Sequence, residues 1–351
     1  MRTFDYSFLS NIVVNSNILQ TTNIIHSLRA DAENKKLAHK AIFDSLVSVA
    51  KVRSVMASNA VEGIVSTDKR ITEIVNNHSE PLNHDEKEIA GYRDALKIIH
   101  ENHDIVHFVE RDILSLHSVL LSLAESPYRG KYKQHDNIVI AINEKGEKSV
   151  RFHPLSALET KQAMEQLVLA YADASSNTSI SPLLLIPCVI LDFLCIHPFM
   201  DGNGRMSRLL SLLLLYQYGY DVGKYISFEA TINNHRDAYY NSLQQSSHGW
   251  KENRNDYMPF IQNFIESLLI CYQELEKRFV SITNGKSSKE KRVESVVMNN
   301  LLPISKKELM DLLPDVSVST IERVLAQMLK EGKIHKLGSF KNARYKRKLK
   351  T

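Results

Sequence analysis

Cysteine is scarce in this chain. Cys188, Cys195 and Cys271 are spread over 351 residues and form neither a C-x-x-C pair nor an even set. This spacing excludes a disulfide framework and favours a reducing compartment.

Long apolar runs are missing as well. The longest, Leu183 to Ile196, contains Pro187 and Asp192 and is shorter than the roughly 20 residues that cross a bilayer. The first residues, Met1 to Asp5, are not followed by the apolar segment of a signal peptide. We therefore expect a cytoplasmic protein that makes no membrane contact.

Strong charge of one sign is also absent, because the net charge is +4. It is spread unevenly: from Lys286 onward, 16 Lys/Arg and 7 Asp/Glu give +9, which leaves 4 − 9 = −5 for the rest. The length of 351 residues predicts about two or three domains. A hydrophobic content of 43% and a charged content of 24% are ordinary for a globular protein.

One polar stretch, His197 to Arg208, lies between two apolar runs, 183–196 and 209–215. This pattern predicts a polar loop between two buried helices. Gly202 and Gly204 free the backbone so that its N–H groups converge, and the next helix begins at that point. Converging amides and a helix N-terminus attract anions.

The other side chains of this stretch suit phosphate chemistry. Arg205 and Arg208 lie three positions apart, so they project from one helix face, and the planar guanidinium suits phosphate oxygens. Asp201 offers the hard oxygen that Mg²⁺ prefers. His197 can exchange a proton near neutral pH. Singly, each residue is more typical of a turn, a helix end or a solvated surface; their joint spacing favours a functional site.

These twelve residues resemble the signature of the Fic family, His-x-Phe-x-Asp/Glu-Gly-Asn-Gly-Arg-x-x-Arg, and match every fixed position. The resemblance implies transfer of AMP from ATP to a Ser, Thr or Tyr hydroxyl of a target protein, with release of pyrophosphate. It implies that His197 is the general base and that Asp201 is the Mg²⁺ ligand. The implied cradle for the α- and β-phosphates consists of Gly202, Asn203 and Gly204. The implied ligands of the outer phosphates are Arg205 and Arg208.

A second motif lies upstream, at the end of a predicted helix that begins near Asp31. Ser58 and Glu62 are one turn apart, and Gly63 is typical of a helix stop. Spacing alone favours a solvated glutamate at a helix end. The hexapeptide resembles the family's inhibitory motif, Ser/Thr-x-x-x-Glu-Gly/Asn, which implies that Glu62 pairs with Arg208 and denies the γ-phosphate its partner.

The resemblance covers most of residues 35–270. Residues 137–152 predict a β-hairpin with its turn at 143–146. The hairpin is either a structural ornament or, by resemblance, a flap whose edge binds the target protein by strand addition. Tyr240 and Leu243 are implied nucleobase contacts, with core packing as the alternative. Lys133 stands where the family commonly has arginine, and Ser247 where some relatives have asparagine.

The C-terminal residues 289–351 predict three helices and a β-wing, which look like a winged helix-turn-helix. Helices are expected at 293–301, from Ser305 and at 317–331, and wing strands at 332–338 and 343–345. In a DNA-binding version the residues that face the groove would be Ser319, Thr320, Arg323 and Gln327. The basic tail, residues 346–348, would contact the phosphates. The alternatives are protein contacts or a homodimer.

The sequence therefore predicts a mainly α protein: a Fic helical bundle with a β-hairpin flap, plus a C-terminal winged helix-turn-helix. The expected regions are 1–90 with the inhibitory helix, 91–281 as catalytic core and 289–351 as winged helix. The predicted function is an autoinhibited protein adenylyltransferase that uses ATP and Mg²⁺. Alternatives are transfer of another nucleotide such as UTP, removal of AMP, and a DNA-binding regulator whose Fic domain senses nucleotide.

Overall fold

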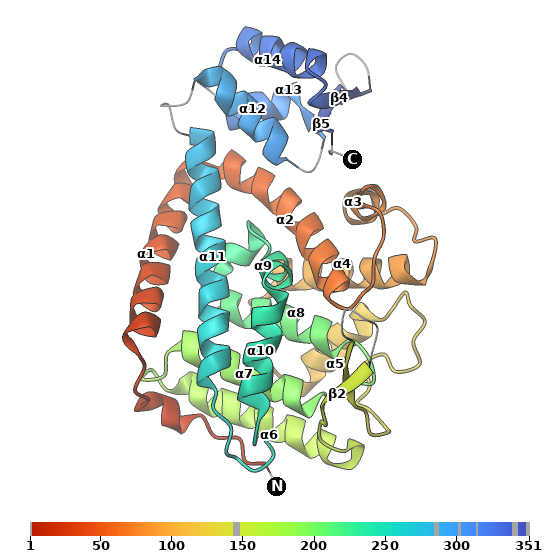
Figure 1. Ribbon diagram of the computed structural model, residues 1–351, viewed down its shortest axis with the longest axis vertical. Coiled ribbons are helices and arrows are strands. Elements are labelled where there is room, and N and C mark those ends of the chain that lie inside the picture. Colours follow the sequence, from red (N-terminus) through yellow and green to blue (C-terminus); the bar gives the residue numbers. More distant parts are fainter. Residues whose placement is uncertain are drawn as a thin grey trace.

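Two apolar helices form the centre of the molecule in the computed structural model (Figure 1). The structure describes residues 2–142, 148–283, 288–300, 303–313, 315–338 and 343–348. Helix α7 (Pro182–Ile196) and helix α8 (Asn203–Gln217) pack against each other. Every residue of α7 after Pro182 is buried, as expected of a helix that is apolar all round. The predicted pair of buried helices around a polar loop is thus confirmed.

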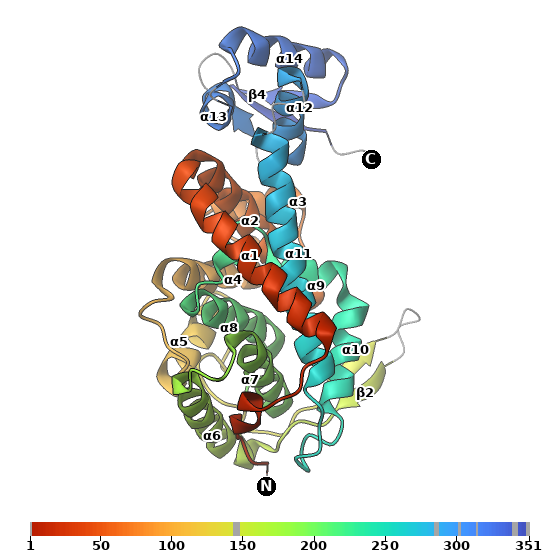
Figure 2. The same ribbon diagram turned by 90° about the vertical axis from the view of Figure 1, so that its left-hand side faces the viewer.

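Other helices surround this pair and are mostly amphipathic. Helix α1 lies along α11 on one side, as both ribbon views show (Figure 2). Short 3-10 helices precede α1 and follow α8, at Ser7–Ser10 and Asp221–Lys224. The surrounding helices are α1 (Ser16–Ala38), α4 (His84–Asn102), α5 (Glu110–Leu120), α6 (Ala157–Ser176), α9 (Phe228–Asn234), α10 (Arg236–Ser247) and α11 (Met258–Thr283).

Helix α2 (Lys40–Val61) carries the upstream motif at its C-terminal end and packs against α4 and α9. The prediction of one helix from Asp31 was wrong. His39 has φ −136° and ψ 49°, which separates α1 from α2. The predicted stop is confirmed, because Gly63 has φ 80°, a conformation that glycine adopts without a Cβ penalty.

The stretch between α2 and α4 contains helix α3 (Asp68–Asn77), which the sequence analysis did not predict. Thr67 caps this helix, since its side chain accepts from the Arg70 N–H. Only a narrow stripe of α3 is apolar and buried, formed by Ile71, Ile74 and Val75. So short a stripe within a polar composition is why the sequence did not reveal it.

The predicted hairpin is confirmed in its strands. Strand β1 (Val139–Ile142) pairs antiparallel with β2 (Lys148–Phe152), with Ile140 opposite Val150. The predicted turn at 143–146 lies outside the described residues.

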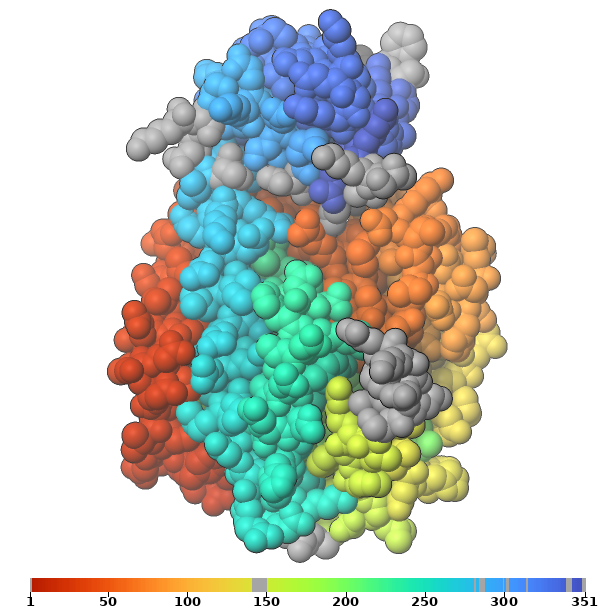
Figure 3. All heavy atoms as spheres, viewed as in Figure 1, coloured from red at the N-terminus to blue at the C-terminus, as the bar shows by residue number. Residues whose placement is uncertain are grey.

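The C-terminal part contains three helices and a three-stranded antiparallel sheet. The helices are α12 (Lys289–Asn299), α13 (Lys306–Leu312) and α14 (Val318–Lys330), and the sheet has the order β3-β5-β4 (Ile304–Ser305, Arg344–Arg347, Ile334–Leu337). The three predicted helices and two wing strands are confirmed, whereas the two-residue β3 was missed. This C-terminal part packs against one end of α2 and one end of α11 (Figures 1 and 3). A cleft of about 1160 Å³ lies between it, α2 and α3.

The three cysteines are free and buried. Within the described part of the chain, none of the helices combines the length and the apolar character that a membrane span requires.

Candidate functional site

The polar loop reverses the chain through left-handed backbone at both of its ends. His197 ends α7 with φ 52° and ψ 61°, and Gly202 precedes α8 with φ 82° and ψ 4°. Helix α8 begins at Asn203. The free N–H groups of its first turn and the positive end of its dipole therefore face the space over the loop.

Two side chains hold the shape of this loop. The Asn203 side chain accepts from the Phe199 N–H at 2.9 Å and donates to the Phe199 carbonyl at 2.7 Å. The Phe199 ring stacks on His117 with centroids 3.7 Å apart. The Gly130 N–H donates to His117 Nδ1 at 3.0 Å, which leaves Nε2 to donate to the Asp201 carbonyl at 3.0 Å. His117 is fully buried and holds the loop through these contacts.

The environment of His197 favours the neutral imidazole. Burial lowers the pKa of His197 to about 4, and the nearby Lys133 cation acts in the same direction. Lys133 is itself buried, where its ammonium donates to the Ile196 carbonyl at 3.1 Å and to Asn137 Oδ1 at 2.9 Å. A neutral imidazole at pH 7 is able to take a proton from a hydroxyl. Lys133 contributes to this state, although the sequence marked it only as a departure from the family.

Arg205 is 1% exposed and lies between two carboxylates. Its Nη1 donates to Glu88, and its Nη2 donates to Asp201 Oδ2 at 3.2 Å. Among the described residues, Nε of Arg205 is buried without a hydrogen-bond partner. No sequence signal pointed to Glu88, because it lies 117 positions from Arg205.

Replacing Glu88 with alanine is expected to lower the free energy of unfolding by about 3–5 kcal/mol, because the Arg205 guanidinium then stays buried with a partner missing. Urea denaturation measures the change. Glu101→Ala is the matched control, since Glu101 is an exposed glutamate on the same helix, α4; we expect it to change stability by less than about 0.5 kcal/mol. Equal stability of the two variants would contradict the role assigned to Glu88.

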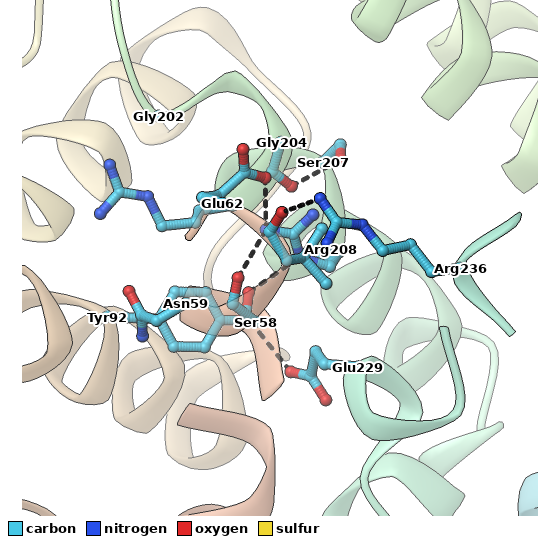
Figure 4. A network of polar contacts seen from close by, with 12 residues as sticks. Ser58, Asn59, Glu62, Tyr92, Gly202, Gly204, Ser207, Arg208, Glu229 and Arg236 are labelled. Carbon is cyan, nitrogen blue, oxygen red and sulfur yellow. Dashed lines mark hydrogen bonds and ion pairs between the residues drawn. The ribbon is translucent and has the colours of Figure 1, made fainter. Parts of the chain in front are cut away.

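The end of α2 engages Arg208 through three hydrogen bonds (Figure 4). Arg208 Nε donates to Ser58 Oγ at 2.8 Å, and Nη2 donates to the Ser58 carbonyl at 2.9 Å and to Glu62 Oε1 at 2.8 Å. Arg208 is 2% exposed. The predicted contact between Glu62 and Arg208 is therefore present, and Ser58 supplies two further bonds.

Glu62 places a negative charge at the start of α8. A Cβ built on Gly204 would lie 2.2 Å from Glu62 Oε1, so the carboxylate rests directly against this glycine. Burial raises the pKa of Glu62, but the charges of Arg208 and Arg205 outweigh it and hold the pKa below its ordinary value. An ionised carboxylate thus lies where the helix N-terminus attracts anions.

Tyr240 and Leu243 lie on α10 and are both half-buried. The Tyr240 ring has the Arg151 guanidinium 4.3 Å from its centroid and the Arg236 guanidinium 5.6 Å from it. Leu243 packs against the hydrophobic core. Their contact with a nucleobase stays a prediction.

The donor set fits Mg²⁺ carried by a nucleotide better than a metal held by protein alone. The Asp201 side chain is 52% exposed. Within the described ranges, no cluster of three or more His, Cys, Asp or Glu side chains forms a metal site. Mg²⁺ is commonly bound by one or two carboxylates together with water and substrate phosphates, and Asp201 supplies such a carboxylate.

Comparison with known sequences relates this site to one protein family. The model of the Fic/DOC family matches residues 107–215. A Fido domain-containing protein of Dictyostelium discoideum is 33% identical over 95 residues, 27% of this chain and 62% of that protein. Protein adenylyltransferase fic-1 of Caenorhabditis elegans is 26% identical over 187 residues, 51% of this chain and 31% of that protein. The matched segments thus span less than two thirds of either relative.

Solved structures show the same fold. A Fic family protein from Desulfovibrio desulfuricans G20 superimposes with a TM-score of 0.63 at 20% identity, covering 97% of this chain and 98% of that one. Residues 134–508 of C. elegans fic-1 superimpose with a TM-score of 0.57 at 18% identity, covering 75% and 72%. The helical arrangement around the polar loop is therefore shared at low sequence identity.

Proposed function

We propose that this chain, which belongs to the Fic/DOC family, is a protein adenylyltransferase that Glu62 holds inactive. The observation that carries the proposal is the Glu62 carboxylate resting against Gly204 while bonded to Arg208. Gly204 and Arg208 belong to the site that suits a nucleotide's phosphates. The Glu62 carboxylate therefore occupies a position that suits a phosphate of the nucleotide. Distant homology to a protein adenylyltransferase supports nucleotide transfer to proteins.

In the proposed reaction, His197 accepts the proton of the target hydroxyl. The hydroxyl oxygen then attacks the α-phosphorus of ATP, the bond to the β-phosphate oxygen breaks, and pyrophosphate leaves. The N-terminus of α8 and the Arg205 and Arg208 guanidinium groups hold the phosphates in line, so positioning and charge supply most of the rate. Asp201 would hold Mg²⁺, which neutralises phosphate charge when bound.

The proposed brake acts on the outer phosphates. Of the three hydrogen bonds that Arg208 donates to the end of α2, two come from Nη2 and one comes from Nε. A γ-phosphate would have to displace the Glu62 carboxylate from this guanidinium and from Gly204. The negative charges of the γ-phosphate and the Glu62 carboxylate repel each other. ATP therefore cannot place its α-phosphate in line while Glu62 stays bonded to Arg208.

We also propose two partner-binding surfaces. The β1–β2 hairpin would bind the target protein along its edge by strand addition. The C-terminal helices and sheet have the arrangement of a winged helix, which we assign to protein contacts. DNA is the less favoured partner, because Arg323 on the exposed face of α14 is bonded to Glu290 at 2.6 Å and Gln327 to Glu331 at 2.8 Å.

The test compares ATP labelled at the α-phosphate with ATP labelled at the γ-phosphate, using the Glu62→Gly protein, Mg²⁺ and a cell extract as the source of targets. We expect protein to be labelled from the α-phosphate alone. Labelling from the γ-phosphate would indicate a kinase reaction instead. A third arm with UTP labelled at the α-phosphate identifies transfer of another nucleotide, and pre-labelled target followed over time identifies removal of AMP.

Arg208→Ala is expected to lower the transfer rate of the Glu62→Gly protein by roughly tenfold to a hundredfold, the loss of a charge-assisted hydrogen bond to phosphate. The background matters, because Arg208 is proposed to hold phosphate as well as the brake. Initial rates with labelled ATP measure the loss. Arg254→Ala is the matched control, since Arg254 is an exposed arginine in the segment before α11. Unchanged rates in both double variants would exclude Arg208 as a phosphate ligand.

A further inference from the structure

A second arginine holds the end of α2. Arg236, at the start of α10, donates through Nη2 to the Val61 carbonyl at 2.9 Å (Figure 4). Val61 is the last residue of α2 and directly precedes Glu62. The last carbonyls of a helix have no partner within it, and a cation near this end is favourable to the helix dipole. Arg236 therefore caps the helix that carries the proposed brake.

The capped end has little other support on its outer side. A Cβ built on Gly63 would meet no atom within 4 Å, and both Glu62 and Gly63 are exposed. On the inner side, Arg208 binds Ser58 and Glu62 from α8. The last turn of α2, in which Ser58, Asn59 and Val61 are buried, is thus also held by two arginines from two different helices. One is bonded to Glu62 itself and the other to the residue just before it.

Arg236 also lies near Tyr240, one of the two predicted nucleobase contacts. Its guanidinium lies 5.6 Å from the centroid of the Tyr240 ring, on which Arg151 of β2 also lies, at 4.3 Å. Figure 3 shows the hairpin strand directly beside α10. One guanidinium group therefore joins the end of the inhibitory helix to α10 and, through Tyr240, to the hairpin.

We propose that Arg236 is a positioning residue of the brake, which holds the last turn of α2 so that the Glu62 carboxylate stays on Arg208. The inference rests on the proposed function, because it presumes that Glu62 inhibits transfer. Without Arg236 the Val61 carbonyl loses its partner and the last turn opens more often, whereas the Arg208 bonds remain. Arg236→Ala therefore relieves inhibition only in part, less than Glu62→Gly does.

The experiment measures transfer from α-labelled ATP in the whole chain of 351 residues, comparing four proteins: wild type, Arg236→Ala, Glu62→Gly and the double variant. We expect Arg236→Ala to raise the wild-type rate by about threefold to tenfold, as the loss of one hydrogen bond allows, and to give no rise when Glu62 is already glycine. Arg236→Lys keeps a cationic donor and is expected to stay within about twofold of wild type. Gln244→Ala, an exposed change on the same helix, is expected to match wild type.

An Arg236→Ala rate at or below wild type, together with an active Glu62→Gly protein, would overturn the inference and leave the proposed function intact. The same factor of increase in both backgrounds would overturn it too. If Glu62→Gly transfers nothing, the proposed function fails, and hydrogen exchange of amides 58–64 then decides the inference alone. Faster exchange in Arg236→Ala than in Gln244→Ala supports it and equal exchange overturns it; Arg236→Gln replaces the alanine variant if that protein does not fold.

Discussion

Glu62→Gly is expected to raise the rate of AMP transfer by roughly a hundredfold over wild type, the effect of removing one charge-assisted bond that competes with the γ-phosphate. The side chain rests against Gly204 and is bonded to Arg208. Its loss frees the N-terminus of α8 and one donor of the guanidinium at once. Initial rates with α-labelled ATP, at equal protein concentration, measure the increase.

Two controls separate charge from bulk. Glu62→Gln keeps the size of the side chain and removes its charge, so we expect a smaller increase than with glycine. Glu101→Ala removes an exposed glutamate of α4 and is expected to leave the rate at the wild-type level. A Glu62→Gly protein that binds ATP no better and transfers no faster than wild type would contradict the autoinhibition.

His197→Ala, made in the Glu62→Gly background, is expected to lower the transfer rate by roughly 10²- to 10⁴-fold, the usual contribution of a general base. Because burial and Lys133 keep the pKa of His197 at about 4, the imidazole is neutral and ready to accept the hydroxyl proton over the physiological range. The affinity for ATP is expected to stay nearly the same, because the proton acceptor holds no phosphate. Single-turnover rates and calorimetric ATP titration measure the two quantities separately.

The matched control for His197 is His248→Ala, since His248 is an exposed histidine at the end of α10; we expect this variant to retain the full rate. A His197→Ala protein that transfers AMP as fast as its Glu62→Gly parent would show that another group takes the proton. A loss of ATP affinity equal to the loss of rate would show that His197 binds nucleotide instead.

The residues that the sequence revealed are those whose chemistry lies within a short segment. His197, Asp201 and Arg205 share one loop and the first turn of α8, so their spacing already brought them together. Glu62 and Arg208 lie 146 positions apart, and only the resemblance to the inhibitory motif connected them. The contact itself is present in the structure.

The residues that the sequence did not reveal act across long separations. Glu88 binds Arg205, and Lys133 binds the carbonyl of the residue before His197. Arg236 binds the end of α2. Each of the three comes from another helix or loop. No periodicity encodes such pairs, because each is fixed only when the helices pack. The same holds for the fold, where long apolar α7 and α8 were predicted but the short, mostly polar α3 was not.

We propose that the Glu62 carboxylate and the terminal phosphate of ATP occupy the same place. The most direct measurement is a crystal structure of the Glu62→Gly protein with Mg²⁺ and a non-hydrolysable ATP analogue. We expect the γ-phosphate on the Arg208 guanidinium and beside Gly204, with Mg²⁺ on Asp201 and the α-phosphate facing His197. A nucleotide bound elsewhere, or one whose γ-phosphate avoids Arg208 although Glu62 is gone, would contradict it.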